Sequence, residues 1–210
     1  MATFCLDIST APLHNAGEFI LPGHPPANYK KPEAIADWQA ADVAEKLAKA
    51  AVDPDLCRIT GIQIHSETTY GIQGPWLCVS EEAEQLAISI VSTCFIRNET
   101  AITYNGRGFD LPVLKRRARY LGVKFPDIST DKYKSPVIDL MTLLSDHDPQ
   151  RRRSLDFYVK RLGWTDLDPK PLSGADEARV FETGQWDLLA QSLQRDVTAI
   201  HRLASWLGVL

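Results

Sequence analysis

Three aspartates stand at positions where a carboxylate needs an explanation, and each belongs to a different part of the chain. Asp7 shares one face of a predicted strand with Cys5, because the segment TFCLDIS alternates apolar and polar side chains. Asp110 stands where an apolar strand passes through an Asn-Gly turn into a basic helix, in ITYNGRGFDLPVLKRRARYLG. Asp196 lies within about 20° of Leu189 on a helical wheel, in the middle of the apolar stripe of the last predicted helix.

A buried carboxylate costs several kcal/mol unless it is protonated, paired with a cation or bound to a metal ion. Two of the aspartates have an ordinary interpretation: Asp110 could cap its helix, and Asp196 could pair with an arginine. Together the three favour another interpretation. Carboxylates brought from separate elements are what oxygen-ligated cations such as Mg²⁺ or Mn²⁺ require.

Composition limits the class of protein. The chain has 210 residues with 27 acidic and 23 basic side chains, so its net charge of -4 does not favour polyanion binding over the whole surface. Any nucleic-acid contact has to come from local patches. The cysteines form no CxxC pair, which predicts reduced core residues in a cytoplasmic protein rather than zinc ligands or disulfides: Cys5, Cys57, Cys78 and Cys94. The N-terminal segment resembles no signal peptide and no apolar run is long enough for a membrane span, so we expect no membrane partner.

The order of the predicted elements indicates a three-layer α/β fold, with a mixed central sheet flanked by helices. The first strand is followed by an irregular insertion at about 11–52, which contains a helix opened by Pro32. Two further strands and a helix capped by Ser80 come next, followed by a strand at AITY and a helix ending at Gly122. An apolar segment, a helix capped by Ser154 and a long terminal helix complete the chain. We expect a single domain over residues 1–210.

The segments around the three aspartates resemble known motifs. YNGRGFDLPVLKRRA is similar to the second exonuclease motif of DEDD-type (DnaQ-like) 3′–5′ exonucleases, which have a ribonuclease H-like fold. FCLDIS resembles their first motif and QRDVTAIHRLASWL their third. The insertion and the lead-in KPLSGADEARVFETGQW resemble the branch related to the proofreading exonuclease of family B polymerases.

The resemblance implies a two-metal site for Mg²⁺ or Mn²⁺ and a nucleic acid with a free 3′ end as substrate, with single-stranded DNA as the expected strand. Asp7 would bridge both ions, Asp196 would hold the ion that activates water, and Asp110 would support the other ion. Asn105 and Phe109 would line the groove, the latter as a stacking surface for a terminal base.

Basic side chains around the second motif are candidates for contacts with phosphate, although a solvated face is the ordinary interpretation of each. Arg107 stands inside the motif, and the following helix is expected to expose four cations: Lys115, Arg116, Arg117 and Arg119. The chain carries no motif that separates DNA from RNA or that specifies a protein partner.

The first and third motifs depart from the family pattern. Ser9 stands where the family has the glutamate of Asp-x-Glu, so it would be a weaker, neutral metal ligand. Ser192 and Gln191 stand where the family has a Tyr or His that orients the attacking water, and the Ser192 hydroxyl is a weak base. Other side chains could enter the site, although none is placed there by spacing: His14, Glu18, Glu67 and His201.

Three hypotheses follow from these departures. The first is a working exonuclease, in which the three aspartates bind metal. The second is a catalytically impaired, exonuclease-derived module that binds nucleic acid without cleaving it. The third is an α/β domain whose acids are only capped or paired.

Overall fold

A mixed sheet forms the centre of the molecule. The computed structural model describes residues 2–66, 73–97, 99–129, 131 and 134–210, and this part of the chain contains five strands in the order β3-β2-β1-β4-β5. β1 pairs antiparallel with β2 and parallel with β4, and β4 pairs parallel with β5. The predicted mixed sheet is therefore confirmed. Its strands are β1 (Thr3–Pro12), β2 (Cys57–His65), β3 (Trp76–Leu77), β4 (Thr100–Thr103) and β5 (Val137–Asp139).

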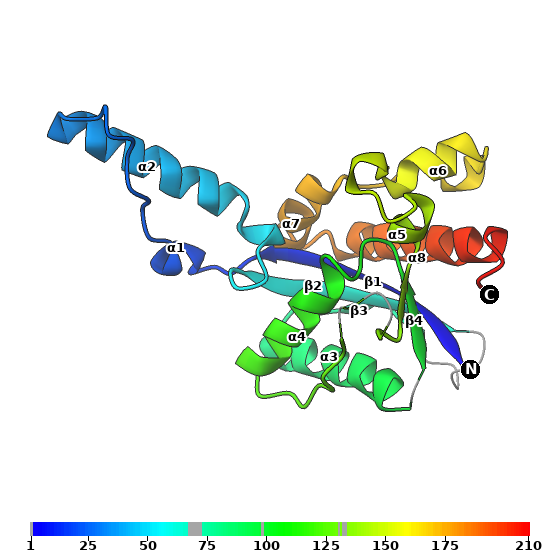
Figure 1. Cartoon of the computed structure of the whole chain (residues 1–210). Coiled ribbons are helices and arrows are strands. Elements are labelled where there is room, and N and C mark those ends of the chain that lie inside the picture. The colour runs from blue at the N-terminus through cyan, green and yellow to red at the C-terminus, as the bar shows by residue number, and fades with distance from the viewer. Residues whose placement is uncertain (1, 67–72, 98, 130, 132–133) are drawn as a thin grey trace.

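Helices cover both faces of the sheet, which gives the predicted three layers (Figure 1). One face packs on α3 (Glu81–Ile96) and α4 (Asp110–Tyr120), and Phe4, Leu6 and Ile8 of β1 point into this core. The other face packs on α8 (Trp186–Trp206), whose apolar stripe meets Cys5. Shorter helices lie near α8: α5 (Leu140–Leu144), α6 (Leu155–Arg161) and α7 (Gly174–Glu182). The alternation of β1 therefore places Asp7 and Ser9 on the α8 face.

Two helix N-caps and one helix C-terminus form as predicted. The Ser80 hydroxyl accepts a hydrogen bond from the Ala83 N–H at the start of α3, and Ser154 caps α6 in the same way through Phe157. Gly122 follows α4 with a φ of +67°, the left-handed conformation that glycine adopts most readily. The second of the two strands expected after the insertion is described only from residue 73, and there β3 has two residues.

The segment between β1 and β2 carries α1 (Ala16–Phe19), α2 (Pro32–Ala48) and a 3₁₀ turn, η1 (Ala50–Val52). Pro32 is the first residue of α2, as predicted, and no residue of this helix is buried. Figure 1 shows α2 extending away from the sheet. β1 itself continues to Pro12, so the strand reaches slightly into the predicted insertion. The single-domain organisation stays a prediction. None of the helices in the described ranges has the length and apolarity needed to cross a membrane.

One predicted phosphate contact is wrong. Arg117 is buried instead of exposed, and its Nε and Nη2 donate hydrogen bonds to the two Glu84 oxygens at 2.8 and 2.9 Å. Glu84 also accepts a hydrogen bond from the Ile59 N–H at 2.9 Å. Arg117 lies on the side of α4 that carries the apolar stripe, so its long side chain is directed toward an interior partner. The pair joins α3, α4 and β2.

Replacing Arg117 with methionine is expected to lower the free energy of unfolding by about 3 kcal/mol, because the buried Glu84 carboxylate would lose its counter-charge. The neighbouring Arg116 offers a matched control, since it pairs with Asp55 at 3.2 Å while both side chains are nearly half exposed. Arg116→Met should cost less than about 1 kcal/mol. Urea unfolding of both variants tests this, and equal losses would contradict it.

Candidate active site

The turn that delivers Asp110 is held by a residue of another strand. Asn105 has a φ of +64°, and a Cβ on Gly106 would come within 2.3 Å of the Thr103 hydroxyl, so only glycine fits there. Asp139, at the end of β5, accepts hydrogen bonds from the N–H groups of Asn105 (3.1 Å) and Arg107 (3.2 Å). Sequence reasoning missed Asp139, whose role depends on the parallel pairing of β4 with β5.

Asp110 is not the cap of its helix. It is the first residue of α4, it is buried, and the capping position belongs to Phe109. The pKa of Asp110 is raised from its ordinary value of 3.8 to about 7, mainly by burial and to a lesser extent by the charge of Asp139. Hydrogen bonds from the backbone of Asp110 itself and of Ile8 act in the opposite direction. The contact with Ile8 places this carboxyl beside β1, next to Asp7.

Asp7 lies at the centre of a group of carboxylates. Its pKa is raised well above the ordinary value, first by burial and then by the negative charges of three acids, while Lys170 lowers it; the acids are Asp196, Asp110 and Glu177. The fold therefore brings the three predicted aspartates together from β1, α4 and α8. It adds Glu177, which belongs to α7.

Asp196 has two cationic partners. Its Oδ2 lies 2.6 Å from the Lys170 Nζ, and its Oδ1 lies 2.6 Å from the Arg195 Nη1. The arginine pair expected from the ordinary interpretation is thus present, beside a lysine that the sequence did not single out. Burial lowers the pKa of Lys170, but the charges of Asp196 and Glu177 outweigh it and the net shift is upward.

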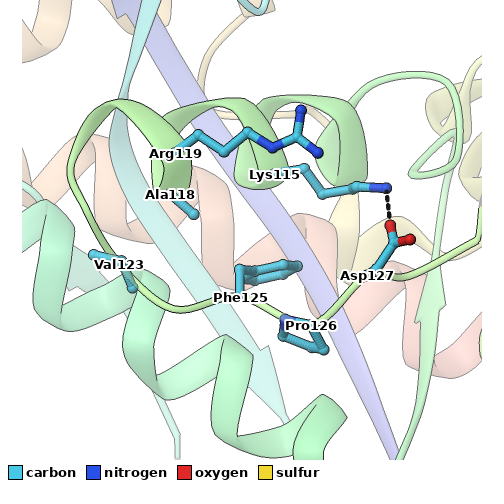
Figure 2. A pocket seen from close by; sticks show the side chains of 7 residues that line it. All are labelled: Lys115, Ala118, Arg119, Val123, Phe125, Pro126 and Asp127. Carbon is cyan, nitrogen blue, oxygen red and sulfur yellow. Dashed lines mark hydrogen bonds and ion pairs between the residues drawn. The ribbon is translucent and has the colours of Figure 1, made fainter.

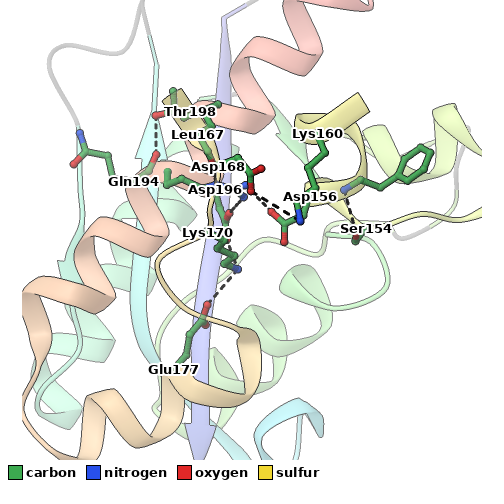
Figure 3. Close-up of polar contacts among 12 residues, drawn as sticks. Ser154, Asp156, Lys160, Leu167, Asp168, Lys170, Glu177, Gln194, Asp196 and Thr198 are labelled. Atoms are coloured by element: carbon green, nitrogen blue, oxygen red, sulfur yellow. Dashed lines mark hydrogen bonds and ion pairs between the residues drawn. The ribbon is translucent and has the colours of Figure 1, made fainter. Parts of the chain in front are cut away.

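Glu177 joins Ser9 to the same lysine. The Ser9 hydroxyl donates a hydrogen bond to Glu177 Oε2 at 2.6 Å, and Glu177 Oε1 lies 3.6 Å from the Lys170 Nζ. Figure 3 shows Asp196, Lys170 and Glu177 in a row. Both newly found residues lie in the segment KPLSGADEARVFETGQW, where the family resemblance was the available signal and periodicity offered none.

The donor set fits a divalent cation that prefers oxygen ligands. Carboxylates from β1, α4 and α8 meet there, and their mutual repulsion is the kind that Mg²⁺ or Mn²⁺ relieves. Two buried polar atoms without a hydrogen-bond partner among the described residues belong to residues that neighbour these acids in the sheet and on α8. Gln63 Oε1 belongs to the residue directly opposite Asp7 in the β1–β2 pair, and Ser192 Oγ is one helical turn before Asp196.

In the described part of the chain, no three His, Cys, Asp or Glu side chains already stand in metal-binding geometry. This agrees with the contacts of Asp196 and Glu177, which direct oxygen atoms toward Lys170. Binding of a divalent ion would therefore require these two carboxylates to exchange an ammonium contact for the ion.

The proposed groove residues have structural contacts. Asn105 and Phe109 flank the turn before Asp110, and Phe109 is partly buried against the core under α4. The Arg107 guanidinium donates hydrogen bonds to the Val137 carbonyl, one of them from Nε at 3.0 Å. These contacts hold the turn in place. They also occupy the Arg107 guanidinium, which was expected to contact phosphate.

The cations of α4 are also engaged. Lys115 pairs with Asp127 at 3.1 Å and Arg116 with Asp55 at 3.2 Å. Lys115 and Arg119 line a small pocket between α4 and the chain that follows it (Figure 2). None of the aspartates of the candidate site lines this pocket. Contacts of these cations with phosphate stay a prediction.

The side chains at the family's water-orienting positions, and the described candidates for replacing missing groups, lie in different surroundings. Ser192 is completely buried, and Gln191 is exposed. His201 packs edge-to-face on His65, with ring centroids 4.7 Å apart. His14 and Glu18 are exposed in the insertion, and Glu67 lies outside the described residues.

Comparisons with known proteins agree with this architecture. Residues 58–207 match the RNase H superfamily. The structure is similar to that of the family B DNA polymerase from the hyperthermophilic archaeon Pyrobaculum calidifontis, with a TM-score of 0.62 and 17% sequence identity over 99% of this chain and 24% of that chain. The chain thus spans about a quarter of the polymerase, and at this identity the likeness shows a shared fold. No curated protein matches the sequence. The predicted ribonuclease H-like fold is confirmed.

Removing the charge of Asp110 should flatten the pH dependence of stability in protein freed of metal by a chelator. The folded-state pKa of Asp110, about 7, exceeds the ordinary 3.8. Stability is therefore lost as pH rises from about 4 to about 7, and this loss of stability persists at higher pH. Asp110→Asn should reduce the loss between pH 5 and 8 by on the order of 2 kcal/mol.

Urea unfolding at several pH values measures this effect. The control is Asp37→Asn, which changes an exposed aspartate of α2 and should leave the profile as in the wild type. Parallel profiles for Asp110→Asn and the wild type would contradict the prediction.

Proposed function

The chain belongs to the RNase H superfamily, and on that premise we propose that it is a metal-dependent 3′–5′ exonuclease of the DEDD type. It would hydrolyse phosphodiester bonds at the free 3′ end of a nucleic acid, with single-stranded DNA as the expected substrate. The observation that supports this proposal is the convergence of Asp7, Asp110 and Asp196 from three separate elements.

Asp7, Asp110 and Asp196 are the residues that would hold Mg²⁺ or Mn²⁺. When bound, such ions lower the pKa of water and stabilise charge on the attacking and leaving oxygens. The chain's own contribution is positional. The Asp139 contacts fix the turn before Asp110, and the Arg195 and Lys170 contacts fix the carboxylate of Asp196.

The same turn supports the proposed binding of a nucleic-acid end. Asn105 and Phe109 lie within five residues of Asp110 along the chain, so groups that could contact a terminal nucleotide accompany a metal ligand. An aromatic ring can stack on any base, which suits an enzyme that removes nucleotides without regard to sequence. With a net charge of -4, the protein would depend on such local contacts more than on its overall field.

A second candidate function is a nucleic-acid-binding module without turnover. Lys170 favours it, because its ammonium already neutralises part of the charge of Asp196 and Glu177. Ser9 and the buried Ser192 favour it as well, since neither is a carboxylate or an exposed base. Such a module would bind DNA with strong salt dependence, because neutralised phosphates release counterions.

Purified wild-type protein is expected to release labelled mononucleotides from a 3′-labelled single-stranded oligonucleotide when Mn²⁺ or Mg²⁺ is added. Asp7→Ala should reduce the rate by at least about 100-fold, because it removes the carboxylate at the centre of the site. Asp187→Asn is the matched control: it changes an exposed aspartate in the first turn of α8 and should cleave as the wild type does.

Cleavage by Asp7→Ala at the wild-type rate would refute the nuclease. Salt-dependent DNA binding without release of label would instead identify the binding module. Parallel measurements on DNA and RNA oligonucleotides of one sequence would define the sugar preference.

A further inference from the structure

Position 9 carries no charge, but a carboxylate from elsewhere in the chain lies against it. Ser9 and Asp7 point to the same face of β1, two residues apart. The Ser9 hydroxyl contacts Glu177 Oε2 at 2.6 Å, across 168 positions of sequence. A short side chain at position 9 leaves room for this contact. A glutamate there would meet the like charge of Glu177 in the same space.

Glu177 is held in this position by its helix and by a cation. α7 packs against both β1 and α8, and its Val180 joins the apolar cluster with Leu189 and Leu193. The Glu177 side chain is 13% exposed, and its second oxygen faces the Lys170 ammonium. The same ammonium contacts Asp196, so the carboxylates of Glu177 on α7 and Asp196 on α8 both face the Lys170 Nζ (Figure 3).

Two unpartnered polar atoms belong to buried residues next to the acids and are a second observation in favour of a ligand there. Gln63 is 5% exposed and Ser192 is fully buried, and neither Gln63 Oε1 nor Ser192 Oγ has a hydrogen-bond partner among the described residues. Gln63 lies opposite Asp7, and Ser192 lies one turn before Asp196. Buried polar atoms are normally satisfied, and unsatisfied ones often border a site for water or an ion.

We propose that Glu177 is the fourth carboxylate of the divalent-cation site, and that α7 supplies it in place of a carboxylate at position 9. The inference rests on the proposed function, because it assigns a further ligand to the same site. It explains how a chain with Ser9 keeps three acidic groups around Asp7. The loss on β1 is offset by a side chain from a neighbouring helix.

The first test is calorimetric titration of Mn²⁺ into metal-free protein. Glu177→Gln keeps the size of the side chain and an acceptor for Ser9 but removes the charge, and it should weaken Mn²⁺ binding by at least about 10-fold. Glu182→Gln, an exposed glutamate of the same helix, is the control and should bind as the wild type does. The double variant Ser9→Glu/Glu177→Gln returns the carboxylate to the strand and should recover most of the lost affinity.

A second variant separates direct coordination from a supporting role. A thiolate ligand favours Zn²⁺ over Mn²⁺, so Glu177→Cys should shift the ratio of Zn²⁺ to Mn²⁺ affinity at least about 10-fold toward Zn²⁺, relative to Glu177→Gln. Glu182→Cys should leave the ratio unchanged. A residue that only positions Lys170 would not change the metal preference.

The outcomes distinguish this inference from the proposed function. If the wild type binds Mn²⁺ through Asp7 while Glu177→Gln binds it equally well, the inference fails and the nuclease proposal stands. An unchanged metal preference in Glu177→Cys also overturns it. If the wild type binds no Mn²⁺ and releases no nucleotide, the proposed function fails first. Melting temperatures of all variants, measured without metal, show whether each one is folded.

Discussion

Repulsion among buried and partly buried carboxylates is the constraint on which the rest of this structure depends. Asp7 lies within the electrostatic reach of Asp110, Asp196 and Glu177, and burial adds to the cost of keeping Asp7, Asp110 and Glu177 ionised. Lys170 offsets part of this cost, and backbone N–H groups at Asp110 offset another part. A protein that keeps such a cluster gives up stability for it, which is the usual pattern of a binding or catalytic site.

The surrounding framework is arranged to hold these acids without neutralising all of them. Asp139 secures the turn before Asp110 through two backbone hydrogen bonds, and the buried pair of Glu84 and Arg117 joins the two helices on that side of the sheet. On the other face, α8 carries Asp196 within an apolar stripe. Each acid therefore comes from an element that is anchored by contacts outside the site. Rigid placement of this kind is what a metal centre or a two-carboxylate mechanism requires.

The departures from the exonuclease pattern become intelligible in three dimensions. Ser9 stands where the exonuclease pattern has a carboxylate, and α7 brings the carboxylate of Glu177 within hydrogen-bonding distance of the Ser9 hydroxyl. Lys170 connects that new acid to Asp196. Under the proposed function, Glu177 would supply from α7 the metal ligand that the strand lacks at position 9, while Asp7 stays at the centre of the site. Fold and site are separable in this sense, and function has to be argued from the site.

The sequence by itself determined what depends on near neighbours. Period-two alternation placed Asp7 on the face of Cys5, the 3.6-residue period placed Asp196 within the stripe of α8, and serine caps marked the starts of α3 and α6. Only the tertiary structure decided which distant side chains meet. Glu177 and Lys170 at the acids and Asp139 under the turn gave no periodic signal. Their partners are chosen by how helices pack on the sheet, and packing joins residues that no local pattern relates.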